Sequence, residues 1–175
     1  MVYYMDTKIK IVDDFLLKED FKNIQDVMLG DSFPWYFNDN IVDVDDSDKF
    51  QFTHNFYRAN RPTSGFYDEW DEILFKPIMG DTVVLSRIKA NCLTRTSEII
   101  QNKFHLDGPP TKPFTISIFY VNSNNGYTKF EDGTRVESVE NRLLTFPVSM
   151  KHTGTTCTDN KIRVLINLLY MRDAI

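Results

Sequence analysis

Three side chains in the second half of the sequence have the chemistry of a metal site. His105 stands two residues before Asp107, and His152, another of only three histidines in the chain, follows much later. Two imidazole nitrogens and one carboxylate oxygen on one face of a divalent ion are the ligand set of non-heme Fe(II) sites with open positions. The same set serves catalytic zinc, with water in the fourth position. The pattern predicts a catalytic metal held by His105, Asp107 and His152.

Arg163, which follows His152, adds a second kind of chemistry. A guanidinium group binds a carboxylate through two parallel hydrogen bonds. A keto acid that chelates iron still carries a distant carboxylate to be neutralised, whereas a zinc hydrolase has no evident need for this arginine. Arg163 therefore favours iron with a keto-acid partner. A surface ion pair at a strand edge is the alternative.

The elements that must position these residues are mostly short β-like runs from residue 83 onward. Turn signals such as Gly108-Pro109-Pro110 separate them. Short strands at such spacing favour a sandwich or barrel, and a double-stranded β-helix, or jelly roll, places a site in its open mouth. In such strands Arg163 shares a face with Leu165 and Asn167. The strands expected are residues 83–93, 103–107, 114–122, 127–131, 136–139, 142–146 and 162–170, with His105 and Asp107 on one face of 103–107 and His152 ending a strand at 147–152.

The fold class expected is thus mainly β with supporting N-terminal helices. Residues 1–82 form a helical and lid scaffold, and residues 83–170 form the jelly-roll core. Apolar spacing predicts helices at 17–29, ended by Gly30, and at 67–75, ended by Pro77. Residues 8–15 and 50–57 are expected to be strands.

Two further features of the N-terminal half have competing interpretations. Residues 33–37 and 55–61 form either a substrate lid, because peripheral loops often carry specificity, or packing between helices and sheet. The acidic residues 43–48 fail the calcium-loop pattern, which needs Gly sixth and Glu twelfth where this chain has Asp48 and His54, so a solvated loop is expected. His54 has no evident partner in the sequence and is expected to be a surface residue or a satisfied core residue.

Composition bounds the function. A chain of 175 residues with 42% hydrophobic and 26% charged residues predicts one globular domain, residues 1–175. The net charge of −5 makes nucleic acid an unlikely partner, since phosphate backbones are bound by clustered Lys and Arg. Cys92 and Cys157 form no disulfide or metal motif, and no secretory or membrane-spanning segment is evident. A cytoplasmic protein without membrane contact is expected, of undetermined oligomeric state.

Residues 87–170 resemble the 2-oxoglutarate and Fe(II)-dependent oxygenase family, in particular its prolyl-4-hydroxylase-like branch. The resemblance rests on His105-x-Asp107, His152 and Arg163 in this order, and on Gly126-Tyr127-Thr128-Lys129-Phe130, which is similar to that branch's Gly-x-Thr-x-Phe strand. The first eighty residues carry none of it. The tyrosine that this branch often has on its first core strand is missing from residues 87–93, where Asn91 is the candidate substitute.

The resemblance implies Fe(II) as the metal, 2-oxoglutarate and dioxygen as cosubstrates, and ascorbate as a candidate further cofactor. Arg163 and Tyr120 would hold the distal carboxylate of 2-oxoglutarate, with Thr128 and Asn167 beside it; for Tyr120 and Thr128, ordinary filling of a β core is the alternative. The reaction implied is C–H hydroxylation coupled to conversion of 2-oxoglutarate to succinate and carbon dioxide. A prolyl residue of a protein or peptide is the leading substrate. A small metabolite, a free amino acid or a nucleobase stays open, as does a non-catalytic jelly-roll binding module.

Overall fold

Two antiparallel sheets form the framework of the protein. The computed structural model describes residues 2–6, 9–41 and 49–172, and within these ranges nine strands make a large sheet and three a small one. The loop expected at 43–48 lies outside the described residues. In sheet order the large sheet is β1 (Val2–Asp6), β2 (Ile9–Val12), β10 (Arg142–Pro147), β7 (Thr115–Tyr120), β12 (Ile162–Arg172), β6 (Thr82–Thr94), β4 (Gln51–Arg58) and β3 (Tyr36–Asn38), with β5 (Arg61–Pro62) paired to β4. The small sheet is β11 (His152–Gly154), β8 (Tyr127–Phe130) and β9 (Arg135–Glu137).

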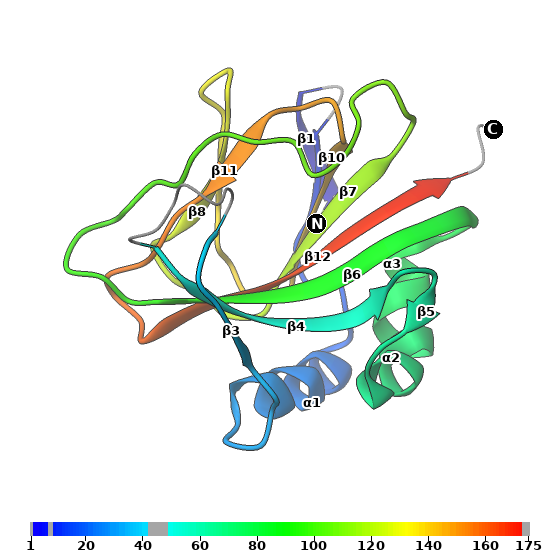
Figure 1. The fold of residues 1–175 in the computed structure, drawn as a ribbon, viewed down its shortest axis with the longest axis horizontal. Helices are drawn as coiled ribbons and strands as arrows, with labels where there is room; N and C mark the ends of the chain where they lie inside the picture. Colours follow the sequence, from blue (N-terminus) through cyan, green and yellow to red (C-terminus); the bar gives the residue numbers. More distant parts are fainter. Residues whose placement is uncertain (1, 7–8, 42–48, 173–175) are drawn as a thin grey trace.

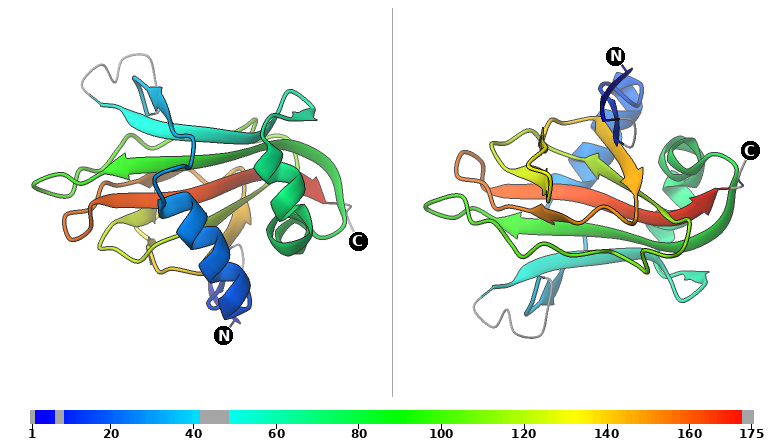
Figure 2. Two further views of the ribbon diagram at one scale, coloured as in Figure 1. Left: turned by 90° about the horizontal axis from the view of Figure 1, so that it is seen from below. Right: turned by 90° about the horizontal axis from the view of Figure 1, so that it is seen from above.

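The helices and the small sheet lie on opposite sides of the large sheet (Figures 1 and 2). The helical elements are α1 (Lys18–Leu29), α2 (Gly65–Trp70), the π-helical turn η1 (Asp71–Phe75) and α3 (Lys76–Met79). None of the described helices is long and apolar enough to span a membrane. The large sheet is therefore the middle layer of the molecule.

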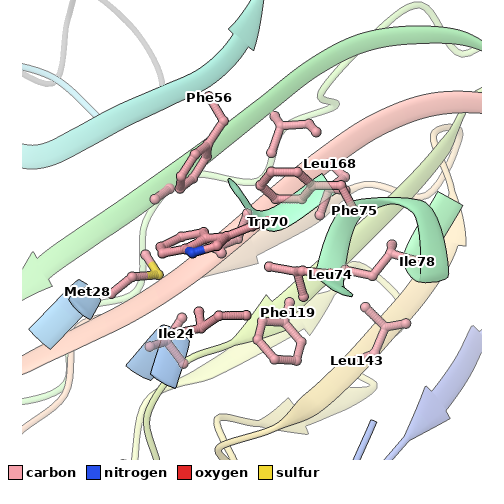
Figure 3. Packing of buried hydrophobic residues seen from close by; sticks show 14 of the residues in the cluster. Ile24, Met28, Phe56, Trp70, Leu74, Phe75, Ile78, Phe119, Leu143 and Leu168 are labelled. Carbon is pink, nitrogen blue, oxygen red and sulfur yellow. The ribbon is translucent and has the colours of Figure 1, made fainter. Parts of the chain in front are cut away.

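Each face of the large sheet buries its own set of apolar side chains because successive residues of a strand point to opposite faces. On the helical side, Ile24 and Met28 of α1 pack with Trp70, Phe119 and Leu168 (Figure 3). Burying each such side chain stabilises the fold by about 1.5–3 kcal/mol. The other face packs against the small sheet through a separate cluster that includes Ile118, Phe130, Leu144, Phe146 and Leu165.

The prediction of a mainly β jelly roll with supporting helices is confirmed, and the strands expected at 83–93, 114–122, 127–131, 136–139, 142–146 and 162–170 are present within a few residues. The helix predicted at 17–29 is α1. Residues 50–57 correspond to β4, whereas 8–15 shorten to β2. Five strands, β1 to β5, extend the large sheet at its two edges from the N-terminal half of the chain.

Three local predictions are wrong. Residues 103–107 are not a strand: only His105 makes a bridge, with His152, because the segment is part of a long connection that runs into the prolines at 109 and 110. His152 begins β11 instead of ending a strand at 147–152. Pro77 does not end the second helix, because it sits in the first turn of α3, where a helix needs no backbone N–H from it.

Candidate active site

A cavity of about 410 Å³ lies between the two sheets. Its walls are β6 and β12 of the large sheet, β8 and β11 of the small sheet, and the connection that carries His105 and Asp107. All three predicted metal ligands line it, as do Arg163, Thr128 and Asn167. Tyr120 does not line it. The structure therefore brings these six predicted residues together from four separate stretches of sequence.

The three predicted ligands form one cluster. A two-residue antiparallel bridge joins the histidine backbones, with the N–H of His105 3.0 Å from the His152 carbonyl and the N–H of His152 3.1 Å from the His105 carbonyl. Nε2 of His105 lies 3.9 Å from Asp107 Oδ1, and Nε2 of His152 lies 3.6 Å from Asp107 Oδ2. The candidate ligand atoms all lie within 4.8 Å of one another.

Both histidines are oriented by the same local contact. Nδ1 of His105 lies 3.2 Å from the Lys103 carbonyl, and Nδ1 of His152 lies 3.2 Å from the Met150 carbonyl. A carbonyl accepts only, so each Nδ1 donates a proton and each Nε2 of a neutral ring keeps its lone pair for a metal. Burial and the neighbouring His152 lower the pKa of His105, which keeps its imidazole neutral.

Asp107 is held as a carboxylate. Arg87 Nη2 donates to its Oδ1 at 3.1 Å, and Asn167 Nδ2 donates to its Oδ2 at 2.7 Å. Burial alone would raise the pKa of Asp107, but the adjacent His152 and the charge of Arg87 outweigh it and hold this pKa well below its usual value. Asn167 was expected beside the cosubstrate; its amide nitrogen orients Asp107.

This donor set fits a divalent ion. A Zn²⁺ or Fe²⁺ ion about 2.1 Å from each ligand places neighbouring ligand atoms about 3 Å apart, so modest side-chain rotation of the cluster suffices. The set is two neutral nitrogens and one hard oxygen, and hydrogen bonds to Nδ1 and to the carboxylate already orient all three. We therefore assign His105, Asp107 and His152 as the residues that would hold a metal.

Arg163 is a fully buried cation without an acidic partner in the described part of the chain. Its side chain is 1% exposed. Nε donates to Ser138 Oγ at 2.8 Å, and Nη2 donates to Thr128 Oγ1 at 3.4 Å, both neutral acceptors. Burial lowers the pKa of Arg163, yet a guanidinium stays charged in proteins. A buried charge without a counter-charge is costly, so an anion bound in the cavity would relieve it.

Two glycines leave room for this arginine. A Cβ on Gly126 would lie 2.7 Å from Arg163 Cδ and 2.9 Å from the Thr156 carbonyl oxygen, closer than real contacts allow. A Cβ on Gly154 would lie 3.4 Å from Arg163 Nη1. Gly126 is the glycine of the segment 126–130 noted in the sequence, and its close approach to Arg163 gives a physical reason for that residue type.

Tyr120 lies behind Thr128. Its ring is fully buried, and its hydroxyl donates to Thr128 Oγ1 at 2.7 Å. Because Thr128 Oγ1 already accepts from Tyr120 and from Arg163, its own proton is left to donate. Thr128 thus adds a hydrogen-bond donor beside the arginine at the cavity wall, and Tyr120 orients that donor.

On the polar face of β6, sequence reasoning named Asn91 as a candidate but missed Arg87 and Lys89. Arg87, Lys89 and Asn91 alternate with apolar residues along this strand, and all three line the cavity. Burial, and next the charge of Arg87, lower the pKa of Lys89 to about 8. Asn91 Oδ1 is buried and has no hydrogen-bond partner among the described residues. The alternation of polar and apolar residues was the available signal.

Outside the cavity, the aromatic residues of the N-terminal half mostly pack together. Phe33 is buried against Phe56 and Trp70, which supports packing over a lid for this residue. His54 is buried, and its ring nitrogens contact the Pro34 carbonyl at 2.9 Å and Ser64 Oγ at 2.8 Å, so of the two expected places it has that of a satisfied core residue. Cys92 and Cys157 are both free and buried.

No protein-family model matches this chain, and no curated protein does. Solved structures do match. A prolyl hydroxylase from Trichoplax adhaerens, in complex with a hypoxia-inducible-factor peptide fragment, is 14% identical with a TM-score of 0.65 and covers 95% of this chain and 84% of its own.

Two other solved structures match over a similar share of this chain. SnoK, an alpha-ketoglutarate-dependent carbocyclase from nogalamycin biosynthesis, is 8% identical with a TM-score of 0.66, covering 97% of this chain and 81% of its own. HygX from Streptomyces hygroscopicus, with nickel and 2-oxoglutarate bound, is 10% identical with a TM-score of 0.60, covering 95% and 84%. The chain therefore shares its jelly-roll fold with prolyl hydroxylases and alpha-ketoglutarate-dependent enzymes.

Proposed function

We propose that this protein is an Fe(II)- and 2-oxoglutarate-dependent oxygenase that hydroxylates a C–H bond. The observation that carries the proposal is that one cavity contains both the cluster of His105, Asp107 and His152 and the buried Arg163, which has no acidic partner among the described residues. A zinc hydrolase would need the cluster but would leave the charge of Arg163 without a purpose. A metal-chelating keto acid with a second carboxylate uses both.

Each residue has a defined task in this proposal. His105 and His152 offer Nε2, and Asp107 offers a carboxylate oxygen, to Fe(II). Arg163 and Thr128 receive the distal carboxylate of 2-oxoglutarate, and Tyr120 keeps the Thr128 hydroxyl turned toward it. When bound, Fe(II) with 2-oxoglutarate and dioxygen supplies oxidation of a C–H bond to an alcohol, with succinate and carbon dioxide as coproducts.

The substrate we propose first is a prolyl residue of a protein or peptide. Its support is the fold shared with a prolyl hydroxylase that was solved with a peptide. A small molecule is the second candidate, because a carbocyclase has the same fold and because cationic side chains line the cavity of this chain. Both candidates use the same metal and cosubstrate.

Anaerobic addition of Fe(II) and 2-oxoglutarate tests the proposal. We expect a weak visible absorption band on addition and release of succinate once oxygen is admitted. His152→Ala should lose both, because it removes one of three ligands. Arg163→Ala should keep metal binding and require at least about tenfold more 2-oxoglutarate, since a charge-assisted hydrogen-bond pair is lost.

The matched control is Arg135→Ala, which removes an exposed arginine on β9, away from the cavity lining. It should leave the 2-oxoglutarate requirement unchanged. A wild-type protein that gives neither band nor succinate would refute the proposed chemistry. An absorption band without release of succinate, whichever substrate is added, would favour the non-catalytic binding module.

A further inference from the structure

We propose that Lys89, with Arg87 beside it, forms a second anion-binding position in the cavity and that this position receives a carboxylate of the primary substrate. This inference rests on the proposed function, since it concerns the substrate of the same site. It narrows the substrate to compounds or peptides that carry a negative charge close to the carbon that is oxidised.

The first argument is that no carboxylate contacts Lys89 directly within the described chain, although the charge of Asp107 acts on it from a distance. It makes no ion pair or hydrogen bond there, although it lies half-buried in the cavity wall. Arg87, two residues before it, donates to Asp107 with Nη2, while its buried Nε finds no acceptor among the described residues. Lys89 therefore has unused donors at the cavity wall, with the positive charge of Arg87 beside it.

The second argument is position. In the pairing of β6 with β12, Arg163 lies opposite Leu93, whereas Lys89 lies opposite Asn167. Four residues separate the two levels along β6, or about 13 Å at about 3.3 Å per residue. Asn167 is hydrogen-bonded to Asp107, and Lys89 is its partner in the strand pairing, so Lys89 lies at the level of the metal cluster. It belongs to a place different from the one that Arg163 occupies.

The third argument is charge. Among the described lining residues are three cations, Arg87, Lys89 and Arg163, and one carboxylate, Asp107. A divalent metal and a doubly charged keto acid cancel each other, so the loaded cavity keeps its excess of positive charge. Both carboxylates of the keto acid are already used, one at the metal and one at Arg163. A further anion is needed to balance Lys89, and the substrate is the remaining ligand.

The neighbouring Asn91 adds a hydrogen-bond acceptor to this position. It follows Lys89 on the same face of β6, and its buried Oδ1 has no partner in the described structure. A substrate with an N–H group next to its carboxylate would satisfy both side chains. Amino acids and acidic peptides have this combination.

Calorimetry on protein loaded with Zn(II) and saturating 2-oxoglutarate tests the inference without turnover. The probes are pairs that differ by one charge: free L-amino acids against their carboxamides, and prolyl peptides that contain Glu against the same peptides with Gln. We expect the anionic member of at least one pair to bind about tenfold or more tightly, as a charge-assisted hydrogen bond predicts. The first series reports a small-molecule source of the carboxylate and the second a peptide source.

Variants assign the effect to Lys89. Lys89→Met should abolish the preference for the anion, Lys89→Arg should retain it, and Lys10→Met, an exposed lysine of β2, should leave it intact. Absence of any charge preference across the panel, or its survival in Lys89→Met, overturns the inference.

The affinity for 2-oxoglutarate tests the alternative that Lys89 binds the keto acid instead of the substrate. It should change less than about twofold in Lys89→Met; a tenfold loss would assign this lysine to the keto acid and overturn the inference. Failure of the wild type to bind metal and 2-oxoglutarate at all would instead refute the proposed function.

Discussion

Replacing Lys89 with methionine should stabilise the metal-free protein at neutral pH. Burial, followed by the charge of Arg87, lowers the pKa of Lys89 from 10.5 to about 8 in the folded state. Each whole step in pKa corresponds to about 1.4 kcal/mol, so the charged lysine costs the fold up to about 3 kcal/mol. Methionine has similar length and carries no charge, so Lys89→Met removes this cost.

The pH dependence gives the prediction its sign. Because the folded pKa lies below that of the unfolded chain, folding releases a proton from Lys89 between about pH 8 and 10.5. The cost is therefore fully present below pH 8 and fades as the pH rises to 10.5. The variant's advantage of up to about 3 kcal/mol at pH 7 should shrink to below about 1 kcal/mol at pH 10.

Urea unfolding followed by circular dichroism, with a chelator present, measures the difference at both pH values. Lys10→Met is the control, because this exposed lysine lies in the same large sheet and should show no such gain. A Lys89→Met protein that is less stable than the wild type at pH 7 would refute the reasoning. So would a gain of the same size at pH 7 and pH 10.

Two further substitutions test how the arginine is held. Gly126→Ala should raise the 2-oxoglutarate concentration needed for half of the visible absorption band about tenfold and cost about 1–3 kcal/mol of stability, because the new Cβ would overlap Arg163. Gly65→Ala, where a Cβ meets open space, should change neither quantity. Thr128→Val should lower the free energy of unfolding by about 1–3 kcal/mol, because it removes the acceptor of the buried Tyr120 hydroxyl, whereas replacement by serine should largely preserve it; equal stability of the two variants in urea would contradict this.

The cluster of candidate metal ligands could be predicted from the sequence because residue type and order alone identify such a ligand set. Few histidines occur, and two of them accompany an aspartate within a β-rich half of the chain. The element that carries His105 was predicted wrongly, since a segment of five residues has too little pattern to separate a strand from an extended connection. What holds this segment is its bridge to His152, a partner far away in sequence.

The contacts around Asp107 could not be predicted for a related reason. Alternation along residues 87–93 shows that β6 has one polar and one apolar face. Which face meets the cavity is decided by the pairing of β6 with β12 and by the helices that cover the apolar side. The local sequence therefore does not distinguish Arg87 from any other polar strand residue. Its ion pair with Asp107 depends on the tertiary packing of the sheets.

Arg163 and Lys89, the two cavity cations without a direct acidic contact among the described residues, differ in how firmly their side chains are held. Arg163 is fixed by neutral acceptors, Ser138 and Thr128, so its planar donors keep one direction, as suits a ligand that is the same in every turnover. Lys89 has no such contacts in the described chain, and its flexible stem lets one charge follow anions of different size. A rigid arginine for the cosubstrate and a movable lysine for the substrate would let this cavity keep its chemistry constant while it accepts related acids.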